Sequence, residues 1–221
     1  MWIVASDFDR TLSHESDKFV IRKDIAEKIN SFSKIYKFFV VTGREERYMK
    51  LLAPGLSPTG WILENGSLIV VNSKKIINAP KNWFTIRQSI SRKLKELGIP
   101  HSFGEVIIYV DSWSEEISFE SARVERNRRD AMILPPNVEK GSGLRIALKE
   151  LNVEGKVVAV GDAENDVSLF RVADYKVAVE NALPEIKSLA DFVLDKEDGD
   201  GVVELLDLIL SGRFPEGVNI H

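Results

Sequence analysis

Short apolar runs alternate along this chain with longer stretches in which apolar residues recur at helical spacing. The first run covers residues 2–5 and ends abruptly before Asp7 and Asp9, which stand one residue apart. Apolar runs of about four to six residues rich in Ile, Val and Trp fit parallel strands that are covered on both faces. We therefore predict a buried first strand that delivers two carboxylates to its C-terminal edge.

The next stretches continue this pattern. Residues 22–34 place apolar side chains on one helical face, and residues 36–41 form a second apolar strand that ends at Thr42. Strand, helix and strand in this order predict a right-handed parallel crossover. Asn65-Gly66 between two apolar runs is a strong hairpin signal. The other segments predicted in this part are a helix at 45–53, a strand at 61–63 and antiparallel strands at 68–71 and 75–77.

The character of the sequence changes after residue 78. The segments predicted there are an amphipathic helix at 83–97, paired strands at 105–110 and 115–121, and a short strand at 132–134 that is closed by Pro135 and Pro136. We interpret residues 80–135 as an inserted α+β cap domain and the double proline as its return. Residues 1–79 and 136–221 then form a discontinuous core domain.

The rest of the chain repeats helix and strand. The predicted helices are 142–151, 164–171, 183–189 and 201–210, and the predicted strands are 156–160, 175–179 and 192–194. This alternation is typical of a doubly wound parallel sheet, so the fold class is α/β with a Rossmann-like core.

Composition narrows the function classes. The 221 residues carry a net charge of −4, so there is no basic excess for nucleic acid binding. Zero cysteines exclude disulfides, thiolate catalysis and Cys-based zinc sites. The three histidines, His14, His101 and His221, are scattered, which argues against a His-based metal site. No apolar run approaches the roughly 18 residues of a membrane span, and Asp7 interrupts any signal peptide, so we expect a cytoplasmic protein with no membrane partner.

Four acids follow two of the predicted strands. Asp7 and Asp9 follow the first strand, and Asp162 and Asp166 follow the buried run at residues 157–160. In open parallel sheets, ligands bind at the carboxyl ends of the strands. Carboxylates brought together there would repel one another by about 4 kcal/mol for a pair at roughly 4 Å and an effective dielectric of about 20. A hard divalent cation removes this repulsion, and all-oxygen ligands favour Mg²⁺.

The motifs D-F-D-R-T, V-V-T-G-R, E-K-G-S-G and V-G-D-A-E-N-D begin at Asp7, Val40, Glu139 and Val160, respectively. In this order they resemble the haloacid dehalogenase superfamily of phosphohydrolases, over essentially the whole chain. The resemblance is closest to small archaeal-type phosphoglycolate phosphatases and to sucrose-phosphatase-like, Cof-type members. One departure is Arg10, because the family usually has Gly after the second Asp; the local loop conformation and access to the site depend on this position.

The resemblance implies a role for each motif residue. Asp7 is the expected nucleophile, which forms an aspartyl phosphate, and Asp9 is the expected acid and base. The residues expected to bind the metal are Asp7, Asp9 through its backbone carbonyl, and Asp162. Asp166 is expected either to bind the metal directly or to contact the groups that bind it. Those expected to bind the phosphoryl group are Thr42, Gly43, Lys140 and Asn165, although Asn165 alternatively caps the following helix.

The expected function is that of a Mg²⁺-dependent phosphomonoester hydrolase for a small phosphorylated metabolite, with 2-phosphoglycolate first and a phosphosugar second. A phosphohexose mutase and a non-catalytic phosphate-binding or partner-binding module are further alternatives, and the chain is expected to be a monomer or homodimer. Residues 64–66 and the cluster of Arg123, Arg126, Arg128 and Arg129 are candidates for contact with the leaving group. The alternative for the cluster is a solvated charged face.

Overall fold

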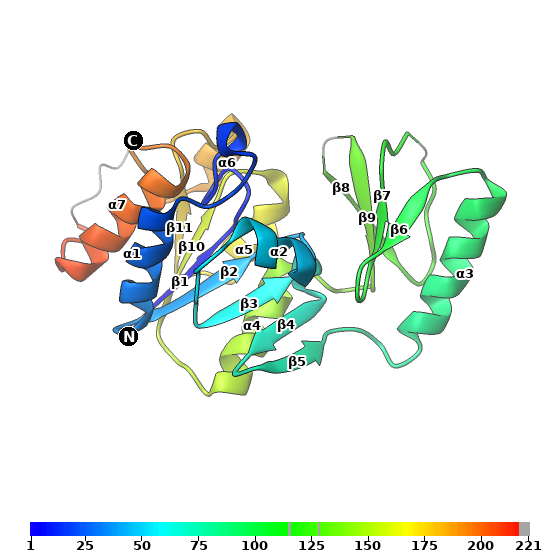
Figure 1. The fold of residues 1–221 in the computed structure, drawn as a ribbon, viewed down its shortest axis with the longest axis horizontal. Coiled ribbons are helices and arrows are strands. Elements are labelled where there is room, and N and C mark those ends of the chain that lie inside the picture. Colours follow the sequence, from blue (N-terminus) through cyan, green and yellow to red (C-terminus); the bar gives the residue numbers. More distant parts are fainter. Residues whose placement is uncertain (115, 128, 217–221) are drawn as a thin grey trace.

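The computed structural model describes residues 1–114, 116–127 and 129–216, and within them the chain forms two β-sheets with helices packed around them (Figure 1). The larger sheet has the strand order β12-β11-β10-β1-β2-β3-β4-β5, and the smaller has the order β6-β7-β9-β8. Figure 1 shows the two sheets beside each other, with helix α3 on the outer side of the smaller one.

The larger sheet is parallel over most of its width. Its parallel strands are β1 (Trp2–Ser6), β2 (Lys37–Val41), β3 (Gly60–Leu63), β10 (Lys156–Gly161), β11 (Tyr175–Ala178) and β12 (Phe192–Val193); β4 (Leu68–Val71) and β5 (Lys74–Ile77) extend it antiparallel. Strand β1 is central, and Ser6 pairs with Val40 on one side and Val160 on the other. The carboxyl ends of these three strands therefore meet at one edge.

Helices cover both faces of this sheet. They are α1 (Lys23–Ser33), α2 (Glu46–Leu52), α4 (Lys140–Leu151), α5 (Val167–Phe170), α6 (Pro184–Leu189) and α7 (Asp198–Leu210). Helix α1 contacts α7, whereas α4 contacts α5, β3 and β4. In Figure 1 the pair α1 and α7 lies on one side of the sheet and α4 and α5 lie on the other, as predicted for a doubly wound fold. Because β1 is covered on both faces, Ile3, Val4 and Ala5 are completely buried.

The smaller sheet belongs to the segment that the sequence sets apart. Its strands β6 (His101–Phe103), β7 (Ile108–Val110), β8 (Arg123–Asn127) and β9 (Asp130–Leu134) are all antiparallel, and α3 (Trp83–Glu96) precedes them in the chain. Trp83 is fully buried, and its indole nitrogen donates to the Val106 carbonyl at 2.7 Å. Helix α3 therefore buries apolar side chains against this segment.

The strand predicted at residues 115–121 is wrong. Residues 116–121 form no strand, and only an isolated bridge joins Phe119 to Ala122, while Glu115 lies outside the described residues. The alternation of Ile117 and Phe119 with polar neighbours resembles a strand pattern. Strand β7, which lies within the partner predicted at residues 105–110, already pairs with β6 on one edge and with β9 on the other. No edge of β7 is left for this segment, and an alternating pattern forms no strand without a partner edge.

Several helix boundaries also differ from the prediction. Helix α4 begins at Lys140 rather than at residue 142, and α7 begins at Asp198 rather than at 201. The helix predicted at 164–171 is divided into a 3₁₀ turn, Glu164–Asp166, and the short α5. The hairpin predicted at Asn65-Gly66 is confirmed, because β3 and β4 pair antiparallel around it and Asn65 adopts a φ of 58°.

Candidate active site at the carboxyl edge of the central sheet

Three carboxylates meet where β1 and β10 end. Asp7 follows β1, Asp162 follows β10, and Asp166 closes the 3₁₀ turn after Asp162. One oxygen from each residue lies within 4.8 Å of the others, and the side chains are almost completely buried. The structure therefore brings together three of the four acids that the sequence marks as metal-binding.

Lys140 binds two of these acids. Its ammonium group is completely buried and donates to Asp7 Oδ1 at 2.6 Å and to Asp166 Oδ1 at 2.7 Å. Lys140 is the first residue of α4, and the N-terminus of this helix is closed by a reciprocal capping box between Glu139 and Ser142. Burial alone would lower the pKa of Lys140, but Asp166 and Asp7 together raise it above its ordinary value, so the side chain stays protonated.

The carboxylates outnumber the lysine. Burial, followed by the charge of Asp166, raises the pKa of Asp7 well above its ordinary value. The same two causes raise the pKa of Asp162 to about 6. Three carboxylates against one ammonium leave two net negative charges in a buried pocket, which is the charge that one divalent cation neutralises. These oxygen donors therefore fit a hard metal ion.

Both carboxylate oxygens of Asp166 already accept from protein donors. Its Oδ1 accepts from Lys140, and its Oδ2 accepts the backbone N–H groups of Asp162 at 2.9 Å and Ala163 at 3.2 Å. Asp166, and not Asn165, therefore caps this turn, and Asn165 lies half-buried within it. The open carboxylate oxygens of the pocket belong mainly to Asp7 and to Asp162, whose Oδ1 accepts the Thr11 hydroxyl at 3.2 Å.

Asp9 is not part of the group of three acids and forms an ion pair with Arg44. The Arg44 guanidinium donates to Asp9 through Nε at 2.8 and 2.9 Å and through Nη2 at 2.6 Å. Both side chains are partly exposed, at 24% for Asp9 and 31% for Arg44. Arg44 lies in the V-V-T-G-R motif, but the motif alone did not predict its contact with Asp9. The available signal was an arginine at the end of the strand beside the one that carries Asp9.

Thr42 and Gly43 form the loop between β2 and Arg44. Thr42 is buried, and its hydroxyl accepts the Arg44 N–H at 3.1 Å. The Gly43 carbonyl accepts the Tyr109 hydroxyl of β7 at 2.6 Å. A Cβ at Gly43 would lie 3.2 Å from the Met132 sulfur of β9, so a larger residue would press on the smaller sheet. The smaller sheet therefore covers this loop directly.

Residues 64–66 join the two sheets. The Glu64 carboxylate is buried and accepts three consecutive backbone N–H groups, those of Glu105, Val106 and Ile107, at 2.7, 2.9 and 2.9 Å. The Asn65 amide donates to Glu125 of β8 at 2.7 Å. These two residues, which are candidates for contact with the leaving group, contact the smaller sheet and the segment before β7.

Three arginines of the cluster, Arg123, Arg126 and Arg129, lie on β8 or directly after it. Arg123 pairs with Glu125 at 2.5 Å and donates to the Val138 carbonyl at 2.5 Å, so it ties β8 to the segment before α4. Arg126 and Arg129 are exposed, and Arg128 lies outside the described residues.

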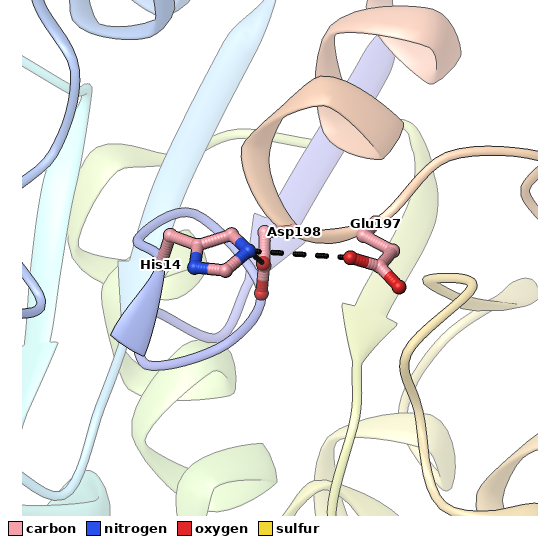
Figure 2. Close-up of side chains that lie close together, drawn as sticks. All are labelled: His14, Glu197 and Asp198. Atoms are coloured by element: carbon pink, nitrogen blue, oxygen red, sulfur yellow. Dashed lines mark ion pairs between the residues drawn. The ribbon is translucent and has the colours of Figure 1, made fainter. Parts of the chain in front are cut away.

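A second group of possible metal ligands lies elsewhere. His14, Glu197 and Asp198 come together at the start of α7 (Figure 2). His14 Nδ1 accepts the Ser16 N–H at 3.2 Å, so Nε2 carries the proton and donates to Asp198 Oδ2 at 3.0 Å. This group is satisfied without an ion. It borders a hollow of about 300 Å³ whose lining includes none of Asp7, Asp9, Asp162 and Asp166.

A family model, curated relatives and solved structures all match this chain over most of its length. The family model for haloacid dehalogenase-like hydrolases matches residues 4–121 and 111–206. A phosphoglycolate phosphatase of Sulfurisphaera tokodaii is 52% identical over 95% of this chain and 94% of that relative. Phosphoglycolate phosphatase 2 of Saccharolobus solfataricus is 50% identical over 99% and 97%. A solved haloacid dehalogenase-like hydrolase from B. subtilis has a TM-score of 0.78 at 18% identity, over 94% of this chain and 99% of that one.

Proposed function

Since the chain belongs to the haloacid dehalogenase-like hydrolase family, we propose that it is a Mg²⁺-dependent phosphatase whose preferred substrate is 2-phosphoglycolate. The buried pocket of Asp7, Asp162 and Lys140 carries the assignment of phosphoryl transfer. The substrate is inferred from the two relatives at about half identity, which are named phosphoglycolate phosphatases.

The metal would be held by the carboxylates of Asp7 and Asp162 and by the backbone carbonyl of Asp9. When bound, Mg²⁺ supplies positive charge to the phosphoryl oxygens and to the acids that surround them. Asp166 then acts through its neighbours, because one oxygen orients Lys140 and the other fixes the backbone of Asp162. We propose that Asp166 is a positioning residue rather than a direct ligand.

In the proposed reaction, an Asp7 carboxylate oxygen attacks phosphorus as the bond from phosphorus to the ester oxygen breaks. Lys140 orients Asp7 and presents its charge to the arriving phosphoryl group. Asp9 gives a proton to the leaving alkoxide and then takes one from the water that attacks phosphorus as the bond between phosphorus and the Asp7 oxygen breaks. Thr42, Gly43 and the half-buried Asn165 line the phosphoryl site. This sequence returns Asp7 and Asp9 to their starting states.

The proposal includes the organisation of the whole chain. Residues 80–135 act as the cap domain over a core domain of residues 1–79 and 136–221. We place the enzyme in the cytoplasm as a monomer or homodimer that acts on a small phosphorylated metabolite. Among the described residues, no helix combines the length and the apolar character needed to cross a membrane.

The test is phosphate release from a panel of monoesters that includes 2-phosphoglycolate, sugar phosphates and an aryl phosphate, with Mg²⁺ or with excess chelator. We expect Mg²⁺-dependent turnover with 2-phosphoglycolate as the best substrate. Full turnover in chelator would overturn the metal assignment, and a preferred sugar phosphate would replace the proposed substrate. A requirement for a sugar bisphosphate activator would indicate a mutase instead.

A further inference from the structure

Arg10 occupies a backbone conformation that favours glycine. Its φ is 58°, in the left-handed region, which is unfavourable for a residue with a side chain. Strain of this kind is kept where the surrounding structure imposes it, often at functional sites. At Arg10 the neighbours do impose it. The Arg10 N–H donates to the Ser13 carbonyl at 2.9 Å, and the Arg10 carbonyl accepts the Asn181 amide at 2.8 Å.

The hydrogen bonds that hold the Arg10 turn extend to the group of His14, Glu197 and Asp198 shown in Figure 2. Asn181 also donates to Asp198 Oδ1 at 2.9 Å, and Asp198 accepts from His14. The turn at Arg10 is therefore held by backbone groups and by this network, and glycine would fill the same turn without strain. The Arg10 side chain is not needed for the fold of the loop, so its contacts point to another role.

Two guanidinium groups share one aromatic ring beside the catalytic acid. The Arg10 guanidinium carbon lies 5.1 Å from the centre of the Phe19 ring, and that of Arg44 lies 5.2 Å from the same centre. Arg44 also forms the ion pair with Asp9. Arg10 pairs through Nε with Glu15 at 3.1 Å, and the Glu15 side chain is 62% exposed, which makes this a weak surface ion pair. Both arginine side chains are partly exposed, at 25% for Arg10 and 31% for Arg44.

This position matches the chemistry of an anionic leaving group. In 2-phosphoglycolate a single methylene separates the ester oxygen from the carboxylate. The ester oxygen must approach Asp9 to receive its proton, so the carboxylate must lie within a few ångströms of Asp9. A guanidinium carries five N–H donors, more than one carboxylate takes up, and it binds carboxylates bidentately. On the cap side, Glu125, Tyr109 and Met132 offer no positive charge, and Arg123 is held by Glu125 and Val138.

We propose that Arg10, together with Arg44 against the Phe19 ring, binds a carboxylate on the leaving group and selects phosphomonoesters that carry one. This inference rests on the proposed phosphatase function and names the residues that determine its specificity. It places the specificity on the core loop after the first strand and not on the arginine-rich β8 of the cap.

The test compares Arg10→Gly with Lys18→Gly. Lys18 is an exposed cation in the same loop with a φ of 55°, so both variants remove a positive charge and relieve the same backbone strain. The substrates are 2-phosphoglycolate and 2-hydroxyethyl phosphate, which replaces the carboxylate by a neutral hydroxymethyl group. For Arg10→Gly we expect kcat/KM on 2-phosphoglycolate to fall about 10- to 100-fold, the effect of losing a charge-assisted hydrogen bond, and kcat/KM on the neutral ester to change less than about 2-fold.

Lys18→Gly should leave both substrates unchanged, and Arg10→Lys should recover part of the selectivity. An equal loss on both esters, or no loss on either, would overturn the role of Arg10. If the unaltered protein hydrolyses neither ester, the phosphatase assignment fails and this inference fails with it. The Tm of Arg10→Gly should stay within about 5 °C of the unaltered protein, which excludes misfolding as the cause.

Discussion

At the scale of single residues, Asp7 and Asp9 occupy different surroundings although they are one residue apart. Asp7 is buried against Lys140, whereas Asp9 is partly exposed and held by Arg44. A buried carboxylate fixed by an ammonium group suits a nucleophile that must attack from one geometry. A partly exposed carboxylate can exchange protons with solvent and with a leaving group. The two residues should therefore fail in different ways when each is replaced by asparagine.

We expect Asp7→Asn to be inert with every substrate, because no other group forms the bond to phosphorus. Asp9→Asn should lose orders of magnitude on 2-phosphoglycolate but still transfer the phosphoryl group from an aryl phosphate, whose phenolate leaves without a proton. Rapid mixing of Asp9→Asn with the aryl ester should give a burst near one phenol per site, with acid-quenched protein labelled at Asp7. Equal inertness of both variants toward both esters would contradict the assigned roles.

Asp162 makes the metal site sensitive to pH. Its pKa in the metal-free fold is about 6, above the ordinary 3.8, because burial and Asp166 oppose its ionisation. A raised carboxyl pKa means that the folded protein binds the extra proton, so this group makes the metal-free fold less stable as pH rises from about 4 to about 6. Below about pH 6 a cation must displace the proton from Asp162 before it can bind there. The affinity of the site for the cation is therefore lower at low pH.

The stabilisation by Mg²⁺, measured as the increase in Tm, should therefore shrink as pH falls from about 7.5 to about 5. Asp162→Asn is the control, because it removes both the titrating group and a ligand and should show little increase at either pH. An increase in the unaltered protein that is the same at both pH values would disprove this coupling.

At the scale of elements, Glu64 is the strongest described connection between the turn after β3 and the segment before β7. Burial raises the pKa of Glu64, and the three N–H groups it accepts partly oppose that shift. Glu64→Gln puts an amide NH₂ group against N–H donors, so we expect a loss of about 1–3 kcal/mol of stability. Hydrogen exchange at the amides of residues 105–107 should accelerate. Glu105→Gln, which changes an exposed carboxylate paired with Lys75, should leave those amides protected.

At the scale of the whole molecule, the two ends of the large sheet have different tasks. The carboxyl ends of β1, β2 and β10 hold the side chains to which we assign the chemistry. At the opposite end, Phe214 packs its ring 5.4 Å from Trp2, 5.3 Å from Tyr175 and 5.4 Å from Phe192, at or near the starts of β1, β11 and β12. Phe214 is only 5% exposed. This aromatic cluster anchors the end of the chain to the sheet.

Phe214→Ala should therefore lower the stability of the fold and leave the catalytic rate unchanged. Removing a buried aromatic ring typically costs about 3–5 kcal/mol, which for a chain of this size lowers Tm by roughly 6–20 °C. The kcat measured well below the new Tm should be unchanged within about 2-fold. Leu210→Ala, at a side chain that is 38% exposed, should shift Tm little. A large loss of kcat in a folded Phe214→Ala protein would contradict this division of tasks.

The strands of the larger sheet, most helices and the acids at the strand ends could be predicted from the sequence, because apolar periodicity and the position of Asp7 and Asp162 after buried runs are local properties. Packing in three dimensions decides which groups pair across the chain: Lys140 with Asp166, Arg44 with Asp9, and Arg123 with Val138. It also decides that residues 116–121 form no strand, because β7, which lies within their predicted partner, pairs with β6 and β9 on its two edges. A long charged side chain can reach several possible partners, and the sequence does not say which. The packing of the folded chain selects one of them.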